Sequence, residues 1–169
     1  MALLNTREVI AAEDAPEVKR LKEQKNYYLE RHAVMHEILG DTLDPEILEL
    51  VYSKFGGNCA ERWGSVDKAR RYKGNLEGFL KDLPSIDQWQ EKAWYDESEK
   101  LITIIGKKRE QCVCSMARTS GSADWCNLCC AGHQKAIFEE VLGQSVKVTM
   151  GETRLTGGER CNQYVRITG

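Results

Sequence analysis

Residues 124–143 read DWCNLCCAGHQKAIFEEVLG and predict one long helix, around which the rest of the fold is arranged. Asp124 is a typical helix-capping residue, and Gly143 follows the last apolar position, where it would end the helix. Segments rich in β-branched or alternating apolar residues flank this helix and predict strands at 92–96, 100–106, 146–150 and 161–167. This order of elements predicts an α+β fold with an antiparallel sheet.

The first ninety residues predict a helical layer, because their apolar residues recur at helical spacing. The longest apolar stripe comprises Val18, Leu21, Tyr28, Leu29, Met35 and Leu39. The helices are expected from about residue 16 to Gly40, from Asp44-Pro45 to Gly56-Gly57, from Asn58 onwards, and from Leu76 to just before Pro84. We divide the chain into an N-terminal helical region, residues 1–84, and an α+β region, residues 85–169, within one compact domain.

Charge and hydropathy exclude several classes of protein. The chain has 24 Lys and Arg against 26 Asp and Glu, a formal net charge of −2, so no basic field points to a nucleic-acid partner. No apolar run approaches the ~18–20 residues that a membrane span needs. The first residues lack a positively charged segment followed by an apolar one, so we expect no signal peptide and a cytoplasmic location.

Seven cysteines are the unusual feature of the composition. Cys59 stands alone, and the other six are Cys112, Cys114, Cys126, Cys129, Cys130 and Cys161. An odd number, an adjacent pair and no export signal fit a disulfide framework poorly. Clustered cysteines in a reducing compartment are more typical of metal or redox chemistry.

The spacing of the cysteines predicts that they meet. In one continuous helix, Cys126, Cys129, Cys130 and His133 would share a stripe, because their offsets are 0, 3, 4 and 7. Residues 109–114 are expected to be extended, which would put Cys112 and Cys114 on one face, before a loop at 115–123. Such donors suit zinc or an iron–sulfur cluster, and zinc would take four of them. The alternative is that the cysteines are small apolar residues of the core.

Two other arrangements are weaker candidates for chemistry. His32 and His36 have the spacing of a zinc-hydrolase helix, but Ala33 stands where that motif has its glutamate. Ordinary histidines of a helix face are the simpler interpretation. Cys59 would be a thiol nucleophile if one of these histidines lay beside it.

The stretch from Asp124-Trp-Cys126 to Gly157-Gly-Glu-Arg-Cys161 resembles the 4-vinyl-reductase-like (hydrocarbon-binding) domain. Phe55-Gly-Gly-Asn-Cys59-Ala resembles the related L-2-amino-thiazoline-4-carboxylic acid hydrolase-like proteins, and the likeness is greatest to a prokaryotic group of this superfamily. The resemblance implies helices on one face of the sheet, a homodimer, and a small hydrophobic or aromatic ligand.

The phenol-sensing members of that superfamily hold zinc with a cysteine at the helix start, a glutamate, a second cysteine and a cysteine in the last turn. Cys126 and Cys161 match the first and the last of these ligands. The other two positions hold Met150 and Thr153. The resemblance therefore implies that the remaining ligands would come from Cys129, Cys130, His133, Cys112 or Cys114.

Three functions are compatible with these residues. The first is a small-molecule-binding or sensory domain organised by a cysteine-rich metal site, with zinc favoured over an iron–sulfur cluster. Trp125 would form a wall of its ligand pocket, and Cys59 is a second candidate there. The second is a metal- or thiol-dependent hydrolase or redox enzyme. The third is a structural domain without metal, in which the cysteines only pack.

Overall fold

The structure is a computed structural model that describes residues 15–169. Residues 1–14, on which the expectation about a signal peptide rests, lie outside the described residues. The α-helices are α2 (Pro16–Thr42), α3 (Pro45–Arg62), α4 (Ser65–Arg70), α5 (Leu76–Ile86), α6 (Ser115–Ser120) and α7 (Ala131–Leu142). A π-helix η1 (Trp125–Cys130) and a short 3-10 helix η2 (Arg154–Thr156) accompany them. The strands are β1 (Gln90–Asp96), β2 (Leu101–Gly106), β3 (Val146–Met150) and β4 (Asn162–Ile167).

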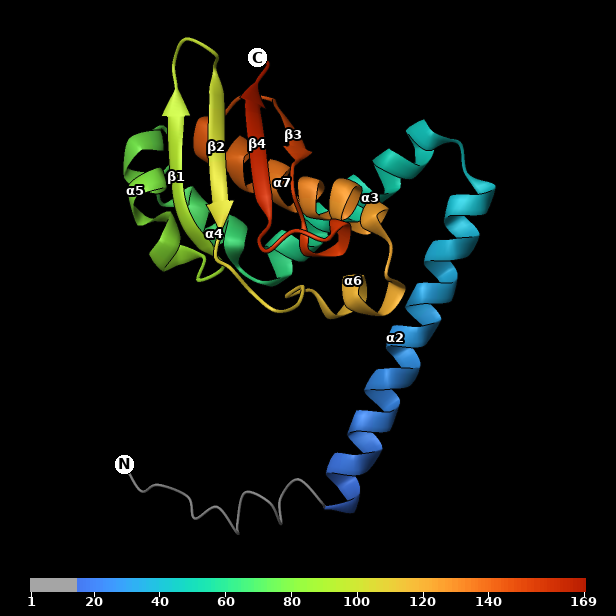
Figure 1. Cartoon of the computed structure of the whole chain (residues 1–169). Helices are drawn as coiled ribbons and strands as arrows, with labels where there is room; N and C mark the ends of the chain where they lie inside the picture. Colours follow the sequence, from blue (N-terminus) through green and yellow to red (C-terminus); the bar gives the residue numbers. More distant parts are fainter. Residues whose placement is uncertain (1–14) are drawn as a thin grey trace, which may run out of the picture.

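The four strands form one antiparallel sheet in the order β1-β2-β4-β3, which confirms the predicted α+β class. Side chains alternate across this sheet, so Ile102 and Ile104 of β2 and Val165 of β4 face a fully buried core. Figure 1 shows α4, α5 and α7 on that side. The other face carries the exposed rings of Trp94 and Tyr164, so the helices cover one face only.

Helices α3 and α7 cross at very close range, and this corrects the expectation that Gly56-Gly57 ends a helix. Helix α3 runs through both glycines. A Cβ atom at Gly56 would lie 2.0 Å from the carbonyl oxygen of Cys129, and one at Gly132 would lie 2.4 Å from that of Ser53. The tertiary contact requires these glycines because it leaves no room for side chains.

Two further local expectations are wrong. Residues 109–114 are not a strand, and the predicted loop at 115–123 contains α6. The guanidinium of Arg118, in α6, donates hydrogen bonds to the carbonyl oxygens of Cys112 and Val113, which turns this segment back on the helix. Pro84 lies inside α5 and does not end it.

Helix α2 is 27 residues long and extends away from the sheet, as Figure 1 shows. It continues two residues past Gly40, the predicted end. His36 is its only buried residue. Half of the predicted apolar stripe is exposed, namely Leu21, Tyr28 and Met35. Together with their exposed neighbours, these residues form a surface that we call the α2 apolar face: Leu21, Tyr27, Tyr28, Val34, Met35 and Ile38. No helix of residues 15–169 is long and apolar enough to cross a membrane.

Candidate thiol and aromatic site

The predicted long helix begins as a π-helix, and this changes where its cysteines point. Residues Trp125–Cys130 form η1, and regular α-helix starts only at Ala131. The Asp124 side chain makes no capping hydrogen bond. Because a π-helix has i→i+5 bonding, the offsets 0, 3, 4 and 7 no longer define one stripe. The four predicted donors therefore separate into different surroundings.

Four cysteines from three chain segments form what we call the Cys126 group. The pKa of Cys126 is shifted by the neighbouring thiols of Cys112, Cys130 and Cys161. Cys161 is in turn close to Cys112. All are free thiols; Cys126 and Cys112 are buried, and the other two are half-buried.

The other three cysteines form a second cluster, the Cys129 group. The thiols of Cys114, Cys59 and Cys126 all help to raise the pKa of Cys129. Cys129 therefore lies between the two groups. His133 belongs to neither, because its electrostatic neighbour is Asp87, next to α5. Cys59 lies near Cys114 and Trp63. No histidine is among the groups that shift its pKa, so nothing supports the predicted thiol–histidine pair.

Burial and neighbouring thiols raise the pKa of five of these cysteines: Cys59, Cys112, Cys126, Cys129 and Cys161. Burial raises the pKa of Cys129 to about 12. The hydrogen bond with Cys112 lowers the pKa of Cys126, but the bond with Cys130 and burial outweigh it and raise that pKa to about 12. The hydrogen bond to Cys126, together with burial, raises the pKa of Cys112 far above its usual range. Protonated thiols are weak nucleophiles and become good metal ligands only when they lose their protons.

An aromatic cluster adjoins the thiols, with Trp125 at its centre. The Trp125 ring is only 2% exposed and meets the rings of His36, Tyr52, Phe55 and His32 edge-on, at centroid distances of 5.2, 5.3, 5.7 and 6.4 Å. The spacing of His32 and His36 thus serves to pack both against one indole. The sequence analysis did not predict Tyr52 and Phe55 as residues of the site, because only the crossing of α3 with η1 brings them to Trp125.

Polar atoms of this cluster lie buried without a hydrogen bond. His36 Nδ1 bonds the Tyr52 hydroxyl, and burial lowers the pKa of His36 and raises that of Tyr52 to about 12. Within the described chain, Trp125 Nε1 and His32 Nδ1 have no partner. Since buried polar groups are nearly always paired, these two atoms are candidates to bind a ligand or water.

An open groove of about 490 Å³ runs between α2 and α6 and reaches this cluster through His32. Its lining comprises Leu21, Gln24, Lys25, Tyr28, Leu29, His32, Ser115 and Met116. Trp125 and Cys59, the predicted pocket residues, are not part of that lining. The wall that Trp125 was expected to form is supplied by His32, which lies against it.

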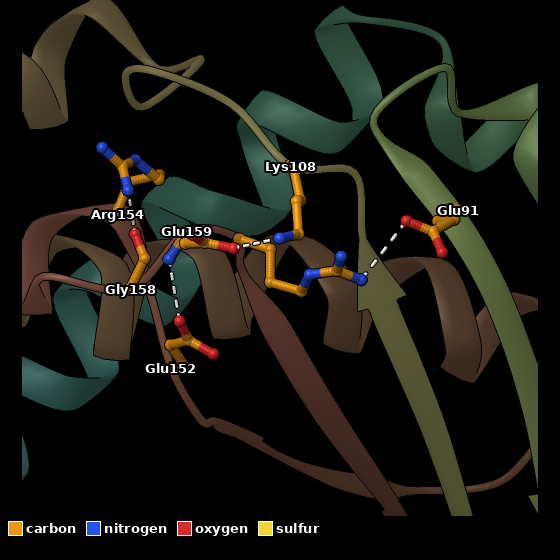
Figure 2. Close-up of polar contacts among 7 residues, drawn as sticks. Glu91, Lys108, Glu152, Arg154, Gly158 and Glu159 are labelled. Carbon is orange, nitrogen blue, oxygen red and sulfur yellow. Dashed lines mark hydrogen bonds and ion pairs between the residues drawn. The ribbon is translucent and has the colours of Figure 1, made fainter.

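A polar network holds the turn that leads into Cys161, as Figure 2 shows. Arg154 donates hydrogen bonds to the carbonyl oxygens of Gly158 and, at 2.7 Å, of Glu110. The Glu152 carboxylate accepts a hydrogen bond of 2.8 Å from the backbone N–H of Glu159. Ion pairs also join Lys108 to Glu159 and Arg160 to Glu91, so the network anchors the turn.

Within residues 15–169, no three or more His, Cys, Asp or Glu side chains are arranged to hold a metal ion. Thr153, where the phenol-sensing proteins would have a ligand, is fully buried and uses its hydroxyl in a capping box with Thr156. The donor set of those proteins is therefore not reproduced at this position.

No known protein family matches the chain, and no curated protein is similar to it in sequence. Several solved structures are similar to this chain at low sequence identity. A trafficking protein particle complex subunit 3 from Naegleria fowleri, covalently bound to palmitic acid, is 14% identical, with 85% of this chain and 97% of that one covered and a TM-score of 0.47. The phenol-responsive sensory domain of the transcription activator PoxR, with phenol, is 13% identical, with 82% of this chain and 74% of that one covered and a TM-score of 0.49.

The third structure is a vinyl-4-reductase family protein from Methanocaldococcus jannaschii. It is 13% identical, with 100% of this chain and 99% of that one covered and a TM-score of 0.37. Its name is that of the family that the sequence resembles. Similarities at this level assign no ligand and no activity to this chain.

Proposed function

We propose that this chain is a small-molecule-binding or sensory domain whose site is organised by a metal ion, zinc in the first place, held by the Cys126 group. The observation that carries the proposal is the convergence of these four free thiols from the loop after β2, from η1 and from the turn before β4. Four thiolates are a typical donor set of structural zinc, and they also suit an iron–sulfur cluster. The proposal narrows seven predicted donors to four.

Metal binding would change the thiols in two ways. They would lose their protons, so binding would weaken as the pH falls. They would also have to move closer together, because among residues 15–169 no three such side chains are arranged to hold a metal ion. A closed site of four thiolates leaves no open position for water, which favours a structural or sensory role over hydrolysis.

The ligand proposed for the domain is a small apolar or aromatic molecule with one hydrogen-bonding group. Leu21, Leu29 and Met116 supply apolar surface in the groove, and the unpaired His32 Nδ1 would bond the polar group. A thiol-dependent enzyme is the weaker alternative, because buried protonated thiols react poorly.

The metal content of the full chain, purified without oxygen, tests the first part of the proposal. We expect one zinc per chain, lost in Cys126→Ser and Cys161→Ser and retained in the matched control Cys59→Ser. Brown protein with iron and sulfide would support the cluster alternative at the same residues. Metal-free protein with freely titrating thiols, or full metal content in Cys126→Ser, would refute the site.

Phenol is a suitable probe for the groove, since its hydroxyl can donate to His32 Nδ1. We expect saturable binding, measured by nuclear magnetic resonance, that Leu29→Trp abolishes by filling the groove. Leu50→Trp is the matched control, because Leu50 is an exposed apolar residue of α3 outside the groove lining. Equal binding by both variants would place the ligand elsewhere.

A further inference from the structure

A second open pocket, of about 380 Å³, lies between the chain after β2 and the turn before β4, and we call it the arginine pocket. Its lining consists of Lys108, Arg109, Glu110, Arg154 and Glu159. It shares no residue with the groove between α2 and α6. Its volume lies within the range of small-molecule sites. Because all five lining residues carry charged groups, its ligand should be charged as well.

The charges of the arginine pocket do not cancel. Three of its side chains are cationic and two are carboxylates. Lys108 forms an ion pair with Glu159, shown in Figure 2, and this contact lowers the pKa of the Glu159 carboxyl. Arg109 and Arg154 form no ion pair with any residue of the described chain. Two guanidinium groups therefore remain without a carboxylate partner, against the exposed side chain of Glu110.

Arg109 is held in place by contacts that leave most of its donors unused. Its Cζ atom lies 4.1 Å from the centroid of the Trp89 ring, and its backbone N–H donates to the carbonyl oxygen of Glu159 at 3.0 Å. Within residues 15–169, its guanidinium makes a single hydrogen bond, a long one of 3.4 Å to the carbonyl oxygen of Gln88. A stacked guanidinium presents its edge, which is suited to two parallel hydrogen bonds to one oxyanion.

Arg154 contributes a donor that is already buried. Two nitrogens of its guanidinium bond the carbonyl oxygens of Gly158 and Glu110, which fixes the group in place. Its Nε is buried and has no hydrogen-bond partner within the described chain. Because buried donors are nearly always paired, this N–H is a candidate to bind an anion. Arg109 and Arg154 are both half-buried, where salt screens their charges less than at full exposure.

We propose that the arginine pocket binds a phosphate group, either as inorganic phosphate or as the end group of a small phosphate monoester. Arg109 would bond two of its oxygens, and Arg154 would supply a further donor. A phosphate dianion matches the two guanidinium charges that have no carboxylate partner. The inference concerns residues outside both the Cys126 group and the groove, so it does not depend on the proposed metal or ligand.

Isothermal titration calorimetry of the full chain with inorganic phosphate and with glycerol 3-phosphate tests the pocket. We expect one site per chain and no binding of glycerol. Tighter binding of glycerol 3-phosphate would support a monoester as the ligand, and equal binding would support the free ion. Arg109→Gln should weaken binding about tenfold, because it removes the bidentate charge-assisted bonds. Glu159→Gln should strengthen binding about threefold, because it frees Lys108 for the anion.

Arg71→Gln is the matched control. It makes the same substitution at an exposed arginine after α4, which forms no ion pair in the described chain and does not line the pocket. It should leave binding unchanged, and circular dichroism should show that every variant is folded. A wild-type chain that binds neither phosphate at about 0.15 M salt would overturn the proposal. Equal weakening by Arg109→Gln and Arg71→Gln, or unchanged affinity in Glu159→Gln, would also overturn it.

Discussion

The contact between α3 and α7 allows a sharp test, because the neighbouring glycines of α3 differ only in what surrounds them. A Cβ atom at Gly56 would meet the carbonyl oxygen of Cys129 at 2.0 Å and the amide nitrogen of His133 at 2.6 Å. At Gly57 the nearest atom would be the Cβ of Ala136, at an ordinary 3.8 Å. Gly56→Ala must therefore separate two backbones, whereas Gly57→Ala fits without movement.

The magnitude follows from the difference between the two variants. Both gain the helix propensity of alanine, about 0.5–1 kcal/mol, so this contribution cancels. What remains is the overpacking at Gly56, about 1–3 kcal/mol or more. For a chain of this length the difference corresponds to roughly 2–12 °C in Tm.

Urea and thermal unfolding, followed by circular dichroism, measure this difference. Gly57→Ala should be as stable as the wild type or more so, and Gly56→Ala clearly less stable. Because Gly56 abuts the backbone of Cys129, its variant should also alter the near-ultraviolet signal of Trp125. Equal unfolding free energies for the two variants would refute the close backbone crossing.

Two further predictions concern the anchor of the turn and the buried histidine. Arg154→Met should lower the unfolding free energy by about 1–3 kcal/mol, measured in urea, because the carbonyl oxygens of Gly158 and Glu110 lose their charged donor; an unchanged value would contradict this role. Burial against Tyr52 lowers the pKa of His36 in the folded state, despite the raising effect of Asp124, so unfolding takes up a proton below the unfolded-state pKa of about 6.5. Stability should be complete above pH 6.5 and fall as the pH drops below it, and His36→Gln should flatten this slope.

The local patterns of the sequence were sufficient for the strands and for the class of fold. Apolar residues alternate along residues 101–106 and 162–167, which indicates strands of a sheet with one buried face. This signal does not depend on which strands pair with each other. The crowding of cysteines between residues 112 and 161 likewise indicated a thiol site. These features depend on neighbours in the chain, so they can be read without the tertiary structure.

Long-range contacts decided the rest of the site. The pair Gly56-Gly57 predicts a helix end, but the helix continues through both residues. Gly56 is needed where the helix crosses its neighbour, because only a glycine lets the two backbones approach so closely. The stripe of Cys126, Cys129, Cys130 and His133 assumed an α-helical period, which the π-helix interrupts. The sequence alone specified a set of candidate donors. The packing of η1 between its neighbours determined which thiols lie close together. The reason is that side-chain direction depends on the type of helix, which the local sequence does not encode.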